Sequence, residues 1–140
     1  MALISHIAPF VGRLFLGLLF LAAGANKLQD QAGTIAYIVK AGLPFPTLAY
    51  WGATLVELLG GILLIVGFQT RLAAAALTAF SIVAAIYFHA NFDDTNQTIH
   101  FMKNFAIAGG LLQIVAFGAG AFSLDDRNRH RSDRLEPARG

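Results

Sequence analysis

The chain has 140 residues, of which 56% are apolar and 13% are charged, against roughly 25% charged in an average soluble protein. This length fits one domain, and the composition favours an integral membrane protein over a soluble four-helix bundle, whose helices would each need a polar stripe. The absence of cysteine excludes disulfides, thiolate catalysis, iron–sulfur ligation and zinc sites with Cys ligands. The net charge of +2 arises largely in the C-terminal tail and does not indicate nucleic-acid binding.

Residues 7–28 form the first apolar run and predict the first membrane span. A spanning helix needs about 20 mainly apolar residues. The uncharged part of the run, residues 14–26, is shorter than that, so the span must contain Arg13. A cleaved signal peptide is the alternative, because the small residues at 23–25 resemble a cleavage site. Against it, no Lys or Arg precedes position 13, and an uncleaved helix gives an even number of spans.

Three more apolar runs predict three more spans, at residues 47–68, 72–88 and 101–122. Glu57 is the single ionisable residue of the first of these runs and lies near its middle. A charged side chain at that depth costs roughly 2.5 kcal/mol or more, so Glu57 should face the bundle interior and find a partner there. The sequence thus predicts an all-α integral membrane four-helix bundle.

The segments between and after the spans are polar. Residues 29–46 interrupt the apolar pattern with charges, glycine and a Pro-Phe-Pro turn, and predict a loop with a short amphipathic helix at 35–40. Residues 123–140 carry five Arg and four acidic residues without apolar periodicity, and we expect this tail to be disordered. The chain then divides into a transmembrane domain, residues 1–122, and an Arg-rich cytoplasmic tail.

The loop charges predict the orientation in the membrane. With both termini in the cytoplasm, seven of the ten Lys and Arg residues lie inside, and three, Lys27, Lys40 and Lys103, lie outside. Lys and Arg are in excess on the cytoplasmic side of membrane proteins. We therefore predict that both termini are cytoplasmic.

The two halves of the chain resemble each other weakly. Arg13 and Arg71 each open an outward-going span, and Glu57 and Gln113 lie near the centres of the spans that follow. A duplicated hairpin of the kind found in some transporters would explain this similarity. The alternative is that the spans share inner Arg residues for orientation alone.

Side-chain direction groups several of the polar residues. A helical side chain leans toward the N-terminus of its own helix. Lys27 and His89, at the outer ends of outward-going spans, therefore lean into the membrane, and Glu57, on an inward-going span, leans outward to meet them. We predict a buried polar cluster of these three residues in the outer half of the membrane, with Lys103 and Asn104 at its rim.

Three further residues are candidate members of this cluster: Arg13, Arg71 and Gln113. In the alternative interpretation the lysines only extend to lipid headgroups, and His89 lies at the membrane interface.

Other motifs give weaker indications. Four side chains of metal-ligand type lie outside the membrane, but a solvated polar loop is commoner than a metal site there, and no metal is predicted: His89, Asp93, Asp94 and His100. No serine has a neighbouring His and acid, so nucleophilic catalysis has no support. Gly109-Gly110 and Gly118-x-Gly120 lie within the fourth apolar run and predict packing sites, because neither follows a strand as a phosphate loop would.

Several short segments occur in a distinctive order along the chain. They are Gly12-Arg13-Leu14-x5-Leu19-Phe20-x3-Gly24-x2-Lys27, Ala41-Gly42-Leu43-Pro44-Phe45-Pro46, Glu57-Leu58-Leu59-Gly60-Gly61, Gly67-Phe68-x-Thr70-Arg71, Phe88-His89, Phe101-Met102-Lys103-Asn104 and Ser123-Leu124-Asp125. In this order and spacing the chain resembles the DoxX family of small bacterial inner-membrane proteins, over nearly all of residues 10–125.

The resemblance implies a multi-pass four-helix bundle in the bacterial inner membrane. For some family members it implies a place as the small membrane subunit of a quinone-linked oxidoreductase, such as thiosulfate:quinone oxidoreductase. A quinone would then be a shared substrate, and the candidate partners besides the lipid bilayer are a soluble oxidoreductase and a second copy of the chain. Nothing in the sequence supplies a catalytic centre for thiosulfate.

Two functions follow as expectations. In the first, the chain is a non-catalytic membrane subunit or anchor of a quinone-linked oxidoreductase system, because a chain without cysteine or a cofactor motif needs a partner for redox chemistry. In the second, the buried polar cluster is a small proton or solute pathway, since ionisable residues inside membranes commonly mark such routes. No resident cofactor is predicted, and we do not expect the chain to be an enzyme by itself.

Overall fold

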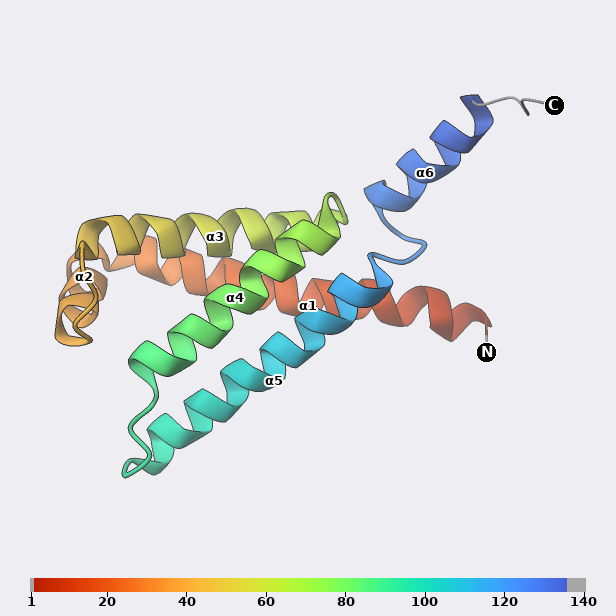
Figure 1. Cartoon of the computed structure of the whole chain (residues 1–140). Coiled ribbons are helices and arrows are strands. Elements are labelled where there is room, and N and C mark those ends of the chain that lie inside the picture. The colour runs from red at the N-terminus through yellow and green to blue at the C-terminus, as the bar shows by residue number, and fades with distance from the viewer. Residues whose placement is uncertain (1, 136–140) are drawn as a thin grey trace.

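A computed structural model describes residues 2–135, which contain six helices and no strand (Figure 1). The helices are α1 (Ala2–Gln29), α2 (Gln31–Lys40), α3 (Pro46–Val66), α4 (Thr70–Phe88), α5 (Thr95–Phe117) and α6 (Leu124–Leu135). Helices α1, α3, α4 and α5 are long and apolar enough to cross a membrane. The prediction of an all-α bundle with four spans is confirmed.

The four long helices form two antiparallel pairs. Helix α1 packs along α3, α4 packs along α5, and a smaller contact between α3 and α4 joins the pairs. In Figure 1, α2 lies at the turn between α1 and α3, whereas α6 lies at the opposite end of the bundle, beyond the turn between α3 and α4. We call these the α2 end and the α6 end.

The fourth span lies several residues earlier in the chain than predicted. Helix α5 covers Thr95–Phe117 instead of residues 101–122. It begins early because the Asp94 carboxylate accepts a hydrogen bond from the Asn96 N–H at 2.8 Å and caps the first turn. It ends early because Gly118 and Gly120 adopt φ values of 84° and 78°, which a helix cannot contain. Gly118-x-Gly120 therefore follows the helix and does not lie within it as predicted, although Gly120 is a packing site, because a Cβ added there would lie 2.9 Å from the Pro9 Cβ.

Two glycines bring α1 and α3 into close contact. A Cβ atom added at Gly17 would lie 2.8 Å from the carbonyl oxygen of Gly61, and one added at Gly61 would lie 2.8 Å from that of Gly17. No side chain fits between the two backbones at this point. The pair of helices can approach this closely only because both positions are glycine.

An apolar layer fills the bundle between its middle and the α6 end. Each of the four spans contributes at least one buried side chain to it: Phe20, Leu64, Ala74, Leu77 and Leu111. These side chains are at most 3% exposed. The four helices are thus closed against one another in this half of the bundle.

Arg13 lies buried at the α6 end, with 1% of its surface exposed. Its Nη1 atom donates to the carbonyl oxygens of Leu64 at 2.8 Å and Ile65 at 3.4 Å, and its Nη2 atom donates to the carbonyl oxygen of Phe122. Leu64 and Ile65 are in the last turn of α3, where backbone carbonyls have no partner within the helix. The guanidinium therefore joins α1 to the end of α3 and to the segment after α5.

The Asp125 side chain forms hydrogen bonds with the start of α4, which lies 55 residues earlier in the sequence. Its carboxylate accepts hydrogen bonds from the N–H groups of Gln69 and Thr70, both at 2.9 Å, and from the Thr70 hydroxyl at 2.6 Å. The Asp125 N–H donates in turn to the carbonyl oxygen of Gly67 at 2.9 Å. These bonds fix the start of α6 to the turn between α3 and α4.

Helix α6 lies within the tail, residues 123–140, for which the sequence predicted disorder. It forms at Leu124–Leu135 because the Ser123 hydroxyl accepts a hydrogen bond from the Asp126 N–H at 3.1 Å, and because two aspartates in its first turn complement the helix dipole. Residues 136–140 lie outside the described part of the chain.

The hydrogen bonds at Asp125 predict a pH-dependent contribution to stability. Burial alone would raise the pKa of Asp125, but the hydrogen bonds from Thr70 and Gln69 and the positive charge of Arg13 together lower it. We expect Asp125→Asn to reduce the free energy of unfolding at pH 7 by about 1–3 kcal/mol, because the amide NH2 group cannot accept the hydrogen bonds that Oδ2 accepts from Thr70. Thermal unfolding in detergent, followed by circular dichroism, would measure the loss.

A carboxylate with a lowered pKa stabilises the fold above its ordinary pKa of about 3.9, and this stabilisation is lost as the pH falls through the lower, folded value. The difference between the wild type and Asp125→Asn should therefore shrink below about pH 4. Asp126→Asn is the matched control, because Asp126 pairs with His130 at 3.5 Å and should cost less. An equal loss at pH 7 and pH 3 would contradict the assignment.

The orientation in the membrane is tested by the accessibility of introduced cysteines, since the natural chain has none. If both termini are cytoplasmic, cysteine at Lys40 or Asn96 should react with an impermeant thiol reagent in intact cells. Cysteine at Arg131, which is exposed on α6, should react only after the cells are lysed. Labelling at position 131 in intact cells would reverse the predicted topology.

Candidate functional site

Lys27 and Glu57 form an ion pair between α1 and α3. Lys27 Nζ lies 2.8 Å from Glu57 Oε2 and 2.9 Å from Oε1. The Glu57 side chain is 4% exposed and that of Lys27 is 25% exposed, so the carboxylate is buried and the ammonium reaches the edge of the bundle. The structure thus brings together the two residues that the opposed lean of their helices predicted to meet.

The packing of α1 against α3 positions both partners. The hydroxyl of Tyr50, a buried residue of α3, donates to the carbonyl oxygen of Lys27 at 3.1 Å and holds the end of α1. Gly24 lies against Glu57, because a Cβ added at Gly24 would be 3.4 Å from the Glu57 Cβ. Because Gly24 has no side chain, α3 can approach α1 closely at this point, and Glu57 can reach Lys27.

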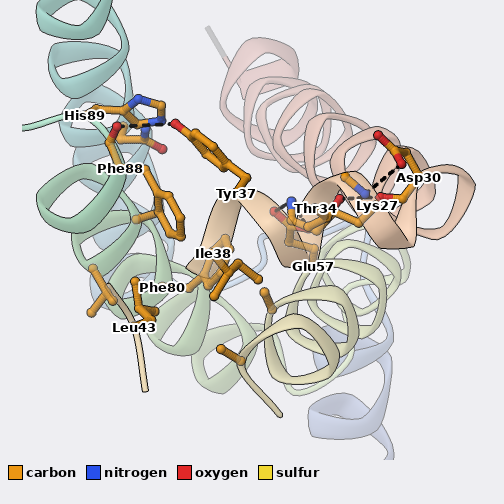
Figure 2. A pocket seen from close by; sticks show the side chains of 16 residues that line it. Lys27, Asp30, Thr34, Tyr37, Ile38, Leu43, Glu57, Phe80, Phe88 and His89 are labelled. Atoms are coloured by element: carbon orange, nitrogen blue, oxygen red, sulfur yellow. Dashed lines mark hydrogen bonds and ion pairs between the residues drawn. The ribbon is translucent and has the colours of Figure 1, made fainter. Parts of the chain in front are cut away.

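The ion pair lies in the wall of a cavity of about 590 Å³ at the α2 end of the bundle (Figure 2). All of the helices α1 to α5 contribute to its lining. Its polar side chains include Lys27, Asp30, Glu57, His89 and Asn104, and much of the remaining wall is aliphatic or aromatic. The cavity thus combines an apolar interior with a few polar groups, as small-molecule sites do.

Helix α2 covers one side of this cavity and is attached to the end of α4. The Tyr37 ring stacks on the Phe88 ring with centroids 5.1 Å apart, and the Tyr37 hydroxyl donates to the Phe88 carbonyl oxygen at 3.4 Å. In Figure 2 these two aromatic side chains lie on one side of the cavity and Lys27 and Glu57 on another. Ile38, also on α2, is buried and lines the cavity.

His89 lies at the rim of the cavity, at the end of α4. Its Nδ1 atom is 2.7 Å from Gln97 Oε1, and its ring stacks on that of His100 with centroids 5.1 Å apart. The Gln97 oxygen accepts hydrogen bonds only, so Nδ1 carries the hydrogen in neutral His89. The Nε2 atom is then the one that can accept a proton.

The remaining predicted members of the cluster lie in different places. Asn104 lines the cavity, and its Nδ2 atom donates to the His100 carbonyl oxygen at 3.0 Å. Lys103 is exposed and lies outside the cavity lining, with Nζ 3.0 Å from His100 Nδ1. The predicted cluster therefore gathers four residues around one cavity, and Lys103 lies apart from them.

The three candidate further members are not near the ion pair. Arg13 is buried at the α6 end, as described above. Arg71 is exposed at the start of α4 and lies beside Gly118, also at the α6 end. Gln113 is exposed on α5. Among residues 2–135, no three His, Asp or Glu side chains are close enough to hold a metal ion together.

Sequence reasoning missed the contribution of α2 to the site. Asp30, Thr34 and Tyr37 line the cavity, but the sequence predicted only a short helix within a loop. The available signal was Asp30 itself, whose carboxylate accepts from the Gly33 N–H at 2.9 Å and caps the helix. Recognising this cap would have extended the predicted helix to residues 31–40.

A double-mutant cycle between Lys27→Met and Glu57→Gln tests the energetic coupling of the ion pair. Each single change leaves one partner without the other, so the two losses of stability should not add. We expect a coupling energy of about 0.6–1.7 kcal/mol, the range of interhelical polar contacts in membranes, in unfolding experiments in detergent. Lys103→Met with Glu57→Gln is the control and should be additive; additivity in both cycles would exclude the pair.

Comparisons with known proteins agree with this architecture. The chain matches the family model described as DoxX over residues 8–90. It is 34% identical over 122 residues to each of two inner membrane proteins of Escherichia coli (strain K12), YqjF and YphA. The alignments cover 87% of this chain and 92% of YqjF, and 84% of this chain and 87% of YphA.

A further relative is "Putative oxidoreductase CatD" of Bacillus subtilis (strain 168), which is 36% identical over 81 residues, or 58% of each chain. No solved structure matches the chain. The family model covers more than half of the chain, and the two inner membrane proteins align over most of its length. Together with the four membrane-spanning helices, these matches make the chain an inner-membrane protein of the DoxX family.

Proposed function

We propose that this protein is a non-catalytic membrane subunit that anchors a soluble oxidoreductase and holds a quinone in the cavity beside Lys27 and Glu57. The cavity carries the proposal. Its volume of about 590 Å³ lies within the roughly 300–1,000 Å³ of sites for small molecules. Its wall is largely apolar and contains a buried ion pair, which suits a ligand with an apolar body and polar oxygen atoms.

The lining residues fit the two parts of a quinone. Phe80, Phe88 and Tyr37 supply aromatic surface, against which a flat ring can stack. Lys27 Nζ carries three N–H donors, more than its contacts with the two Glu57 oxygens use, and quinone carbonyl oxygens accept hydrogen bonds. The fit supports a quinone as the shared substrate.

Ionisable residues of the cavity wall can also supply protons to a bound quinone. Reduction of a quinone to a quinol consumes two electrons and two protons. The partner would supply the electrons, and the protein would supply the protons through side chains that already line the cavity. Glu57 and Lys27 are in direct contact, and His89 Nε2 is available to hold a proton because Nδ1 is bonded to Gln97.

A soluble partner is part of the proposal for two reasons. The chain has no cysteine and no motif for a bound redox cofactor, so the electrons must come from another protein. The name "Putative oxidoreductase CatD" supports a redox setting for a relative. Because the cavity lies at the α2 end, the partner would dock over α2 and the α4–α5 loop.

The alternative, a small proton or solute pathway, has less support from the packing. A pathway needs access from both ends of the bundle. Between the cavity and the α6 end, Phe20, Leu64 and Leu111 belong to a buried apolar layer, and beyond it the Arg13 guanidinium is bonded to three backbone carbonyls. An arrangement open at one end favours binding over passage.

Filling the cavity tests the quinone site. Ala84 lines the cavity, whereas Ile86, two residues later on α4, is 53% exposed. We expect a short-chain quinone to raise the melting temperature of the purified protein in detergent, and we expect Ala84→Phe to abolish this rise. Ile86→Phe should leave it unchanged, because that side chain faces away from the cavity.

Three outcomes would count against the proposal. The first is that quinone fails to stabilise the natural protein, or stabilises Ala84→Phe equally. The second is that no soluble oxidoreductase accompanies the protein when it is mildly extracted from its native membrane. The third is that the purified protein alone moves protons or solutes in liposomes and Glu57→Gln stops this, which would favour the pathway.

A further inference from the structure

The wall of the cavity has a polar side and an apolar side. The polar side contains the ionisable side chains Lys27, Asp30, Glu57 and His89. The apolar side is supplied mainly by α3 and α4 and includes Ala49, Ala53, Phe80, Val83 and Ala84. In Figure 2, Leu43 and Phe80 lie on the side of the cavity opposite Asp30. A ligand that fills the whole cavity therefore needs a polar head and an apolar extension.

The apolar side continues the line of contact between α3 and α4. Nearer the α6 end this contact is close, because a Cβ added at Gly60 would lie 2.8 Å from the Leu77 Cγ. Ala53 and Ala49 precede Gly60 by seven and eleven residues, so they lie on the same face of α3, but they line the cavity. In Figure 1, α3 and α4 diverge from their turn toward the α2 end. The apolar side of the cavity thus lies where the two helices have separated.

Val83 lies where this space reaches the outer surface of the bundle, because it lines the cavity and is 48% exposed. It is five residues, or about 7.5 Å, from the end of α4 at Phe88. Ala53 is seven residues, or about 10 Å, from the start of α3 at Pro46. Both helices are membrane spans, so the space opens at the depth of the lipid hydrocarbon chains. We call the gap bordered by Ala49, Ala53 and Val83 the α3–α4 opening.

The chemistry of the α3–α4 opening selects what can pass through it. None of its three bordering side chains can form a hydrogen bond, and the backbone groups of a helix interior are bonded within the helix. A polar solute would lose its hydration in the opening without compensation. A hydrocarbon chain would pass from the lipid into the cavity without leaving an apolar environment.

We propose that the ligand is a quinone with a hydrocarbon tail, which enters from the bilayer between α3 and α4 and leaves its tail in the α3–α4 opening. The inference rests on the proposed function and adds the class of quinone, one that is carried by the membrane. Larger side chains at Ala49 and Ala53 would close the opening, so the alanines keep room for a chain. The ring would lie at the polar side of the cavity, beside Lys27.

Photolabelling locates the tail directly. A quinone whose isoprenoid tail carries a diazirine is irradiated with the natural protein in lipid nanodiscs, and the labelled residues are identified by mass spectrometry. We expect labels at Ala49, Ala53 and Val83, and we expect an excess of short-chain quinone to displace them. Labels at Leu59 and Ile86, which are 56% and 53% exposed on the same two helices, that resist displacement and equal those at the opening would overturn the proposal.

Closing the α3–α4 opening separates the path of the tail from the binding of the ring. Val83→Trp should weaken binding of the tailed quinone roughly tenfold, the effect of one overpacked contact, and should leave binding of the short-chain quinone unchanged. Ile86→Trp is the matched control on the same helix, because Ile86 lies outside the cavity lining, and it should change neither. Equal binding of the tailed quinone by Val83→Trp and by the natural protein would overturn the proposal.

The remaining outcomes distinguish this inference from the proposed function. If the natural protein binds neither quinone, the proposed function fails and this inference fails with it. If the short-chain quinone binds but the tail labels α2 or α5, only this inference fails. A phospholipid with a diazirine on its acyl chain that labels the α3–α4 opening, and that the tailed quinone does not displace, would assign the opening to a lipid and overturn the proposal.

Discussion

Helix α1 (Ala2–Gln29) carries two buried or half-buried cations, Arg13 near its middle and Lys27 in its last turn, and α3 supplies a partner for both. Lys27 meets the carboxylate of Glu57, and Arg13 meets backbone carbonyls in the last turn of α3. The two cations are 14 residues apart in sequence, or about 21 Å along the helix. Neither could remain in the membrane interior alone without a large desolvation cost, so the two contacts together fix how α1 lies along α3.

The remaining helices are positioned by contacts that start from the α1–α3 pair. Once the end of α3 is held by Arg13, the turn that follows it is in place to receive the carboxylate of Asp125, which caps α4. Helix α4 then aligns α5, and at the other end Tyr37 attaches α2 to α4. The two ends of the molecule consequently differ: one is closed by hydrogen bonds to backbone groups, and the other retains a cavity.

The features that could be predicted from the sequence are those that depend on local pattern. Apolar runs gave the four spans, and the direction in which helical side chains lean gave the meeting of Lys27 with Glu57. The features that were missed depend on contacts between distant segments. Asp125 caps a helix that starts 55 residues earlier. The end of α5 was missed because the residues after Gly118 are also apolar, and hydropathy does not indicate that Gly118 has a positive φ.

The buried ion pair itself argues for a function. Two well-packed apolar side chains at the positions of Lys27 and Glu57 would stabilise the fold about as much as the ion pair, or more, because the desolvation cost of two buried charges offsets most of their Coulombic attraction. Leucine and methionine could therefore replace the pair with little loss of stability. Its position explains more: it lies where the bundle leaves a cavity, whose wall on another side contains the imidazole of His89 (Figure 2). A charge pair placed at an opening, and not in the packed layer below it, is suited to meeting a ligand that exchanges protons.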